Sequence, residues 1–377
     1  MIRRLRLKEY LKVALLALFI SSGVCTIAFT QRSNIYAFAA KYKHRNPPSR
    51  FSRLDSKKFF QRYTVETSIA SRRDVLVARN SLKKILTSKA SYSLDVNKDG
   101  CKNIDNIVNV DFVCDELNFN DVDNVNSIVY FFRPEVRSNK LIIYHQGHGG
   151  DFRELSKEVV GRFLSEGYDV MSFDMPLYGK NPIPNSLPNQ VKMNYKSINK
   201  HGALRFYESN QRHLLSFFLT PVVLGIDYAL DINNYSVVSM VGLSGGGWTT
   251  VLSAALDDRI DMAFPVAGSL PLGLRTYDVG DAEQIYTSFY KQFPYLDLYI
   301  LGSVSDSGRK REHYQISFID DLCCFSGDRS LLYSRQIGEV VSGLGGSFDV
   351  KIEDQSEHKI KDVTTDFILE KIKSFSK

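Results

Sequence analysis

Cysteine is scarce in this chain, which has five among its 377 residues. So few cysteines exclude a small scaffold held together by disulfides. No internal repeat and no low-complexity segment interrupts the sequence. Hydrophobic residues make up 44% of the chain and charged residues 24%. These proportions are typical of a globular protein and exclude an intrinsically disordered one.

Basic residues are few beyond the first 60 positions, although the whole chain has a net charge of +6. Residues 1–60 contain 13 Lys and Arg against 2 Asp and Glu, whereas residues 61–377 contain 35 against 40. The body is therefore mildly acidic, and the excess positive charge lies in the N-terminal segment. This distribution predicts that nucleic acid is not a partner.

An apolar run without charge follows a cationic N-terminus. Residues 13–29 contain no charged side chain, and these 17 residues are at the short end of what spans a bilayer as a helix. The small residues expected before a signal-peptide cleavage site come only at Ala37 and Ala39, well past this run. We therefore predict an uncleaved transmembrane signal-anchor, with cleavage and secretion as the alternative. The run is preceded by five cations, Arg3, Arg4, Arg6, Lys8 and Lys12.

These cations also predict the orientation in the membrane. The positive-inside rule leaves residues 1–12 as a cytoplasmic basic tail and exports the body to the periplasm or the extracellular space. Residues 30–60 then form a basic tether. In an exported body Cys101 and Cys114 could form a disulfide, whereas two buried thiols are the alternative.

Short apolar segments alternate with helical segments from residue 141 onward. Because the apolar segments carry no polar face, the alternation predicts a central, mostly parallel sheet covered by helices on both faces. Residues 175–210 and 271–296 are too long for simple connections, so we expect lid insertions over a site. Strands are expected at residues 126–133, 141–145, 168–174, 235–243, 260–268, 314–319 and 347–353.

The sequence Gly-Leu-Ser-Gly-Gly occupies residues 242–246, directly after an apolar strand and directly before a helical segment. This strand–turn–helix context is that of a nucleophile elbow, although the five-residue motif also occurs by chance in Gly-rich turns. Gly242 and Gly246 allow neighbouring backbone to approach closely, and the N-terminus of a helix favours developing negative charge. We therefore predict Ser244 as the nucleophile.

A second Gly-rich turn, His-Gln-Gly-His-Gly-Gly, covers residues 145–150 at the end of an earlier strand. Such a turn can direct backbone N–H groups at an oxyanion. We expect the N–H groups of His148 and Gly245 to be the donors, with Gly149 as the alternative to His148. A zinc site built from His145, His148 and Asp151 is a competing interpretation, but no second ligand pair is visible elsewhere, so we predict no metal.

The base and the acid are expected after the last strands, in the order Ser, acid, His. His358 follows the strand at 347–353, and no other histidine has this position. Asp321 is our preferred partner for His358, while Asp320 and Asp328 remain open as the acid. The histidines His201, His213 and His313 are expected at the surface or the rim of the site.

These motifs together resemble the α/β-hydrolase family, and within it serine esterases and dienelactone-hydrolase-like proteins. The resemblance covers about residues 125–377 and rests on residues 242–246 and 145–150, on the Asp-Met-Pro-Leu-Tyr-Gly turn at 174–179, and on Asp321 and His358. It implies an α/β-hydrolase fold in which a Ser-Asp-His triad hydrolyses an ester, or less often an amide.

The chain departs from the family pattern at Trp248, where a small or aliphatic residue is more usual, and in the form of the 145–150 turn. Residues 61–124 lie outside the resemblance as an N-terminal extension. Residues 95–100 have the spacing of the first half of a calcium loop, but Asn106 stands where a bidentate Glu is required. We therefore predict no cofactor.

The combined expectation is a membrane-anchored serine hydrolase with a catalytic domain at residues 125–377. It would cleave a carboxylic ester, such as a short acyl or acetyl group, on a small molecule or a glycan. A serine peptidase or amide hydrolase with the same triad is the first alternative. A catalytically silent binding protein that keeps the fold is the second.

Overall fold

The computed structural model describes residues 65–376 except 99, 102–110, 186–199, 276–280, 322, 324 and 326. The predicted cytoplasmic tail, signal-anchor and tether at residues 1–60 therefore lie outside the described residues, as does half of the candidate calcium loop at residues 95–106. None of the helices in the described part of the chain is long and apolar enough to span a bilayer.

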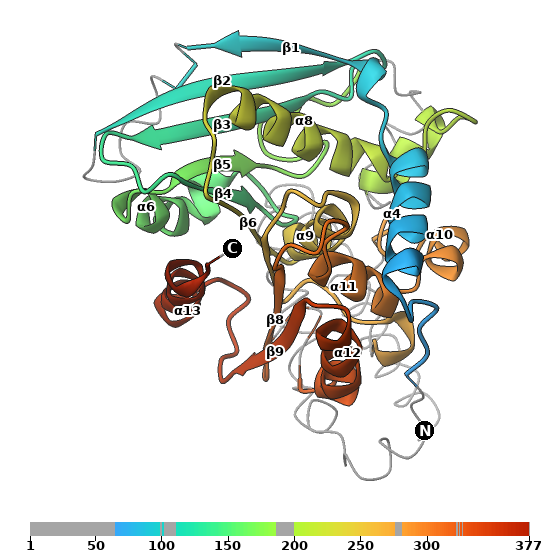
Figure 1. Cartoon of the computed structure of the whole chain (residues 1–377). Helices are drawn as coiled ribbons and strands as arrows, with labels where there is room; N and C mark the ends of the chain where they lie inside the picture. Colours follow the sequence, from blue (N-terminus) through green and yellow to red (C-terminus); the bar gives the residue numbers. More distant parts are fainter. Residues whose placement is uncertain are drawn as a thin grey trace, which may run out of the picture. The chain divides into compact units, whose positions relative to one another are not determined.

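A nine-stranded sheet runs through the molecule in the order β1-β2-β3-β5-β4-β6-β7-β8-β9. Strands β1, β2, β3 and β5 pair antiparallel, and all pairs from β5 to β9 are parallel (Figure 1). The mostly parallel sheet expected from the alternating pattern is thus confirmed. The strands are β1 Tyr92–Asn97, β2 Phe112–Asp121, β3 Ser127–Pro134, β4 Lys140–His145, β5 Asp169–Phe173, β6 Val237–Leu243, β7 Met262–Val266, β8 Glu312–Phe318 and β9 Ser347–Glu353.

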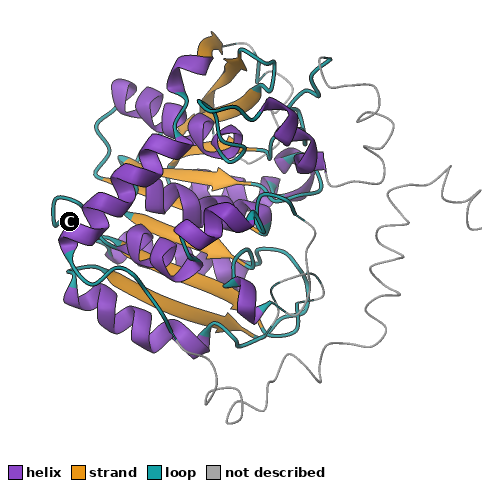
Figure 2. Ribbon diagram, turned by 90° about the vertical axis from the view of Figure 1, so that its right-hand side faces the viewer, coloured by secondary structure: helices purple, strands orange, loops and turns teal. Residues whose placement is uncertain are grey.

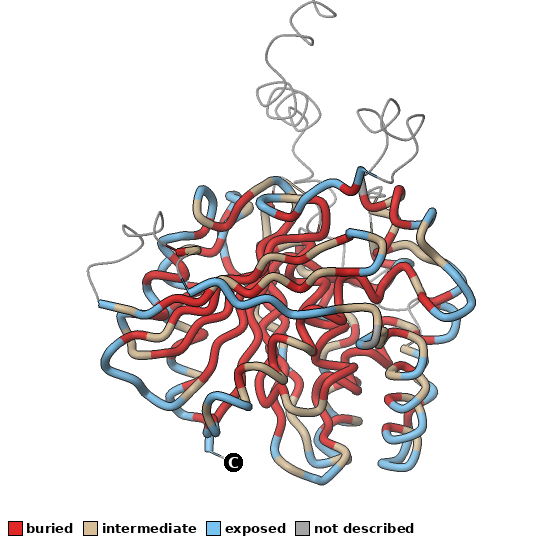
Figure 3. Tube along the Cα trace, turned by 90° about the horizontal axis from the view of Figure 1, so that it is seen from above, coloured by how far each residue is buried: buried red, intermediate tan, exposed pale blue. Residues whose placement is uncertain are grey.

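Helices cover both faces of this sheet (Figure 2). Successive residues of β4 show why: Ile142 and Tyr144 pack in a cluster with α6 and α13, whereas Leu141 and Ile143 pack with α8 on the opposite face. Strands β4 to β8 are buried along almost their whole length, so the sheet core appears as continuous buried segments (Figure 3), whereas the edge strand β9 is only partly buried. The helices are α4 Arg72–Leu86, α5 Phe152–Leu155, α6 Lys157–Ser165, α8 Ser216–Ile232, α9 Gly245–Leu256, α10 Thr287–Gln292, α11 Tyr295–Ser303, α12 Leu331–Gly343 and α13 Asp362–Ser374.

The N-terminal extension is part of the same folded unit. Strand β2 pairs with β3, so the boundary expected at residue 124 falls inside one continuous sheet. A disulfide joins Cys101, in the turn after β1, to Cys114 on β2. Helix α4 begins with a capping box, in which Ser71 and Asp74 bind each other's backbone N–H groups. It packs against α8, α9 and α11.

Two fully buried arginines join α4 to the core. Arg79 on α4 donates to the carbonyls of Ala255, Leu301 and Val304 and pairs with Asp306. Arg311, at the start of β8, donates to the same two carbonyls of Leu301 and Val304. Burial lowers the pKa of Arg311 to about 9, with the charge of Arg79 as the next cause. These contacts replace the water that buried guanidinium groups would otherwise require.

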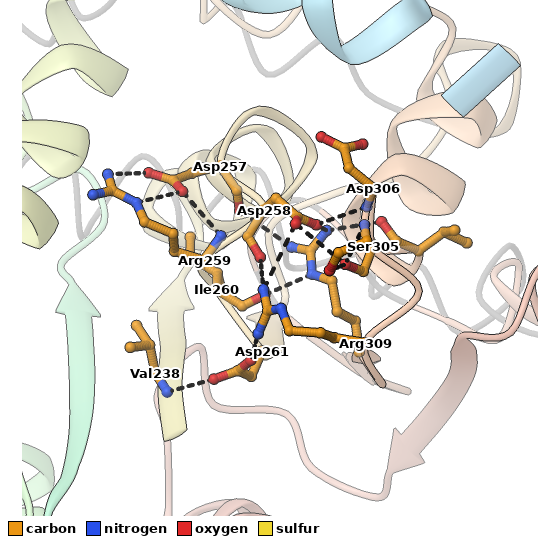
Figure 4. Close-up of polar contacts among 12 residues, drawn as sticks. Val238, Asp257, Asp258, Arg259, Ile260, Asp261, Ser305, Asp306 and Arg309 are labelled. Atoms are coloured by element: carbon orange, nitrogen blue, oxygen red, sulfur yellow. Dashed lines mark hydrogen bonds and ion pairs between the residues drawn. The ribbon is translucent and has the colours of Figure 1, made fainter. Parts of the chain in front are cut away.

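An acidic loop between α9 and β7 lies next to these arginines (Figure 4). Asp257 pairs with Arg259, and Asp261 pairs with Arg309 while accepting a bond from the backbone N–H of Val238 on β6. The buried carboxylate of Asp261 therefore fixes the amino end of β6 against β7. Together, these ion pairs hold the end of the central strands that lies away from Ser244.

Candidate active site

Three of the predicted catalytic residues follow strands that run in the same direction. Ser244 comes directly after β6, Asp321 shortly after β8 and His358 shortly after β9. Because β6, β7, β8 and β9 pair in parallel, their carboxyl ends meet at one edge of the sheet. The sheet topology therefore brings the nucleophile, acid and base candidates to the same edge.

Ser244 has the backbone conformation of a strained strand-to-helix turn. Its φ is 58° and ψ is −121°, a combination that non-glycine residues rarely adopt, and its side chain is half-buried. The backbone N–H of Ser244 donates to the carbonyl of Val266 at 2.8 Å. A Cβ at Gly242 would overlap the backbone of Gly246, and a Cβ at Gly246 would overlap the carbonyl of His145. Glycine is thus required at both positions for the turn to close.

His358 and Asp321 form a close ion-pair contact. Nδ1 of His358 lies 2.7 Å from Oδ2 of Asp321, whose side chain is fully buried, and the second carboxylate oxygen accepts a bond from the backbone N–H of Cys323. Because an ionised carboxylate only accepts, the proton sits on Nδ1 and Nε2 carries the lone pair. This Nε2 is buried and has no hydrogen-bond partner among the described residues. The structure places Asp321, rather than Asp320 or Asp328, against the ring.

The 145–150 turn lies directly beside the nucleophile. A Cβ at Gly147 would lie 2.8 Å from Cβ of Ser244 and 3.4 Å from the backbone nitrogen of Gly245. Gln146 anchors the turn, because its side-chain oxygen lies 3.0 Å from the Tyr144 hydroxyl and 2.5 Å from the Ser156 hydroxyl. Gly245 opens α9, so its N–H has no partner within the helix.

The turn at 174–179 closes around the carboxylate of Asp174. This carboxylate accepts bonds from the backbone N–H groups of Phe152 and Lys180, and Gly179, with φ of 56°, packs against it. Burial, followed by the nearby charge of Asp151, raises the pKa of Asp174 to about 7. The buried carboxylate thereby links the start of α5 to the first insertion.

The structure separates the residues of the zinc site considered from the sequence. Nδ1 of the buried His145 donates to the carbonyl of Gln146 at 2.9 Å, and burial lowers the pKa of His145 to about 4. Asp151 caps α5 and pairs with Arg153. With these partners, His145 and Asp151 do not combine with His148 to bind a metal.

His148 instead contacts one residue from each insertion. Its Nε2 lies 3.1 Å from Nδ1 of His201 and 3.0 Å from Oε1 of Glu283. His201 and Glu283 are fully buried, and their facing atoms are 2.9 Å apart. The expectation that His201 and His313 lie at the surface or rim was wrong, because both are fully buried. His213 is half-buried and contacts the ring of Tyr286.

The second insertion is attached to the elbow helix through Trp248. The indole Nε1–H of this fully buried residue donates to the Tyr290 hydroxyl at 2.7 Å, and this hydroxyl donates to the carbonyl of Glu283 at 2.8 Å. Trp248 also packs edge-on against Phe218 of α8. The unusual residue at position 248 thus connects α9 with the segment that supplies Glu283.

Sequence reasoning did not identify Glu283 or its proximity to the two histidines. His201 and Glu283 are 82 residues apart and lie in separate insertions without regular pattern. No spacing rule relates such positions. Only the folded insertions bring their side chains together.

Comparison with known proteins identifies the fold. No family model and no curated protein sequence matches the chain. The acetyl xylan esterase from Paenibacillus sp. R4 superposes with a TM-score of 0.52 at 13% identity, over 86% of this chain and 100% of that one. The methylesterase BT1017 superposes with a TM-score of 0.55 at 15% identity, over 80% of this chain and 64% of that one. The chain has the α/β-hydrolase fold. The fold implied by the sequence motifs is therefore confirmed.

Proposed function

We propose that the protein is a serine hydrolase that cleaves a carboxylic ester. The observation that carries the proposal is the orientation of His358. Asp321 holds its Nδ1–H, and its buried Nε2 lone pair is left without a partner in the described structure. Ser244 stands on a strained elbow at the same edge of the sheet. The orientation of His358 and the position of Ser244 support an acyl-transfer triad, in which Nε2 would take the proton of the serine hydroxyl.

The reaction follows from these positions. Oγ of Ser244 attacks the acyl carbon while Nε2 of His358 takes its proton, and Asp321 stabilises the imidazolium. The N–H groups of Gly245 and His148 bind the oxyanion, with Gly149 as the alternative to His148. The tetrahedral intermediate collapses as His358 returns the proton to the leaving alcohol, which leaves an acyl group on Ser244. Water, deprotonated by His358, attacks this acyl-enzyme and releases the acid.

The proposed substrate is a short acyl or alkyl ester on a glycan or a small molecule. The names of the two superposed proteins support it, since one is an acetyl xylan esterase and the other a methylesterase. Both act on esters of small groups by name. Their sequence identity to this chain is low, so the support comes from the common fold together with Ser244, Asp321 and His358.

A fluorophosphonate probe tests the activated serine directly. We expect stoichiometric labelling at Ser244 in the wild-type chain, located by peptide mass mapping, and none in Ser244→Ala. Ser165→Ala removes an exposed serine of α6 and should label like the wild type. A screen of acetyl, butyryl and methyl esters beside matched amides then assigns the class. Faster turnover of the amides would favour an amide hydrolase, and a folded chain that neither labels nor turns over any ester would be a silent binding protein.

We also propose that the body is exported and anchored by residues 13–29. The cationic flank and the apolar run support this location, and so does the Cys101–Cys114 disulfide, because disulfides persist in oxidising compartments. In cell fractions the full chain should remain with the membrane after a carbonate wash, whereas deletion of residues 13–29 should release it. Thiol alkylation should find Cys101 and Cys114 oxidised in cells. Reduced thiols at both positions would contradict export.

A further inference from the structure

Three potential metal ligands meet beside the 145–150 turn. They are Nε2 of His148, Nδ1 of His201 and Oε1 of Glu283, and the three distances between them are 3.1, 3.0 and 2.9 Å. Ligand atoms about 2.0–2.1 Å from a tetrahedral zinc ion lie roughly 3.3 Å from one another. The triangle is therefore within a few tenths of an ångström of the base of such a coordination shell.

The hydrogen bonds of His201 turn Nδ1 toward the carboxylate. Its Nε2 lies 2.9 Å from the carbonyl oxygen of Pro176, which can only accept, so Nε2 carries a proton. Nδ1 then lies 2.9 Å from Oε1 of Glu283. At this distance the two atoms repel each other unless a proton on Nδ1 or a metal cation lies between them.

A metal ion accounts for more of the geometry than a single proton does. A proton on Nε2 of His148 can be shared between two edges of the triangle at most, whereas all three edges are close to 3 Å. The second oxygen of Glu283, Oε2, is buried and has no hydrogen-bond partner among the described residues. A carboxylate oxygen without a partner is costly in a buried position, and a divalent ion beside this carboxylate lowers that cost.

The surroundings of the two histidines match those of metal ligands. A metal-bound histidine usually donates its other ring N–H to a carbonyl or carboxylate, which fixes the tautomer and orients the ring. His201 does so with Pro176, and Nδ1 of His148 faces Oδ2 of Asp281 at 3.7 Å. Glu283 is positioned in turn by the Tyr290 hydroxyl, which binds its backbone carbonyl.

We propose that His148, His201 and Glu283 bind a zinc ion. Two imidazoles and one carboxylate suit zinc better than magnesium or calcium, which prefer oxygen ligands. The side chain of His148 is 19% exposed while the other two are fully buried, so a fourth position on the His148 side is open to water. The ion would tie both insertions to the turn that abuts Ser244. The proposal does not rest on the serine hydrolase activity proposed above, although the backbone N–H of His148 is also a candidate oxyanion donor.

The test measures zinc bound to the full chain, purified without a histidine tag and dialysed against metal-free buffer. On addition of zinc chloride we expect one equivalent per chain by mass spectrometry of the metal, and a higher melting temperature. Cobalt chloride should give the visible absorption bands of a tetrahedral site. Ser244→Ala should bind zinc as the wild type does, which separates this proposal from the catalytic one.

Two variants address the ligands and one serves as a control. Glu283→Gln and His201→Asn should weaken zinc binding by 10-fold or more. His213→Gln removes a histidine that lies just after the first insertion and is not a ligand, and this variant should bind one equivalent. The proposal would be overturned if the folded wild-type chain bound less than about 0.1 equivalent of zinc, a measurement that does not depend on the folding of any variant. It would also be overturned if Glu283→Gln and His201→Asn both bound zinc as tightly as the wild type does.

Discussion

Nδ1 of His358 and Oδ2 of Asp321 lie 2.7 Å apart, and the two residues come from loops that follow adjacent parallel strands. The fully buried carboxylate is also held by the backbone N–H of Cys323. Oδ1 accepts the bond from Cys323, and Oδ2 orients the imidazole ring of His358. Loss of the Asp321 carboxylate should therefore lower activity, and the neighbouring Asp320 and Asp328 provide matched controls.

Asp321→Asn should lower kcat for a short ester on the order of 10⁴-fold, because an amide can stabilise the wrong tautomer of His358 and cannot stabilise the imidazolium. Asp320→Asn and Asp328→Asn carry the same chemical change within the same loop region. Both should keep kcat within about 2-fold, since neither side chain contacts His358 in the structure. Steady-state kinetics of the three variants measure these changes in kcat. An equal loss in Asp320→Asn or Asp328→Asn would assign the acid elsewhere.

Arg79→Met should destabilise the fold by about 3 kcal/mol or more, because it leaves several buried carbonyls and a half-buried carboxylate without their donor. Arg79 is fully buried and binds Asp306 and the Ala255 carbonyl. Arg335→Met removes an exposed arginine that pairs with Glu339, and its unfolding midpoint should match the wild type. Urea unfolding of both variants provides the comparison. An unchanged midpoint for Arg79→Met would contradict a structural role of this residue.

The buried His313 should make the fold sensitive to acid. Burial lowers its pKa from about 6.5 in the unfolded chain to about 3, with the charge of Arg311 as the next cause, and neither ring nitrogen has a partner among the described residues. Since the unfolded state binds the proton first, this contribution to stability is complete above pH 6.5 and falls as the pH is lowered, by about 2 kcal/mol at pH 5.

His313→Leu should remove this dependence while keeping a similar volume between Tyr299 and Phe348. The loss of unfolding free energy between pH 7 and pH 5 should be smaller in the variant by that amount. Urea titrations of both proteins at the two pH values measure the difference. An equal loss of unfolding free energy between pH 7 and pH 5 in the two proteins would show that His313 binds a proton as readily in the folded chain as in the unfolded chain.

Tyr290→Phe should loosen the second insertion without touching the nucleophile. The change removes the hydroxyl that accepts from Trp248 and donates to the Glu283 carbonyl, and it leaves the buried indole N–H unpaired. We expect a loss of about 1–3 kcal/mol in stability and a weaker zinc affinity by 10-fold or more. Tyr286→Phe, which removes a hydroxyl bound to Glu208, serves as the control. Unchanged zinc affinity in Tyr290→Phe would mean that Glu283 is positioned by other contacts.

The parts of the fold that the sequence predicts are those with a strong apolar signal. Strands β4 to β8 are largely buried runs, and the structure has each of them, and the partly buried β9, within a few residues of the expected bounds. Strand β1 was not predicted, because nearly all of its residues are exposed at the edge of the sheet and they form no apolar run.

The candidate site also contains some residues that the sequence predicts and some that it does not. Ser244 and His358 were singled out by local motifs and chain order, whereas three aspartates within nine positions could not be ranked without the folded loop. The errors at His201 and His313 have different causes. His201 was placed at the surface or rim because it lies in a long insertion, and His313 because it precedes the strand expected at 314–319. Strand β8 in fact begins at Glu312, and both side chains are fully buried. A residue buried by distant parts of the chain carries no periodic signal of its own.

The position of Arg79 in the chain has a consequence for the order of events during synthesis. Its carbonyl partners at Ala255, Leu301 and Val304 lie 176, 222 and 225 residues later. At roughly 5–20 residues per second, α4 leaves the ribosome roughly 10 to 45 s before the residues it binds have been made. Helix α4 is therefore one of the first helices to be translated, but Arg79 can bind all of its carbonyl partners only after α11 has been synthesised.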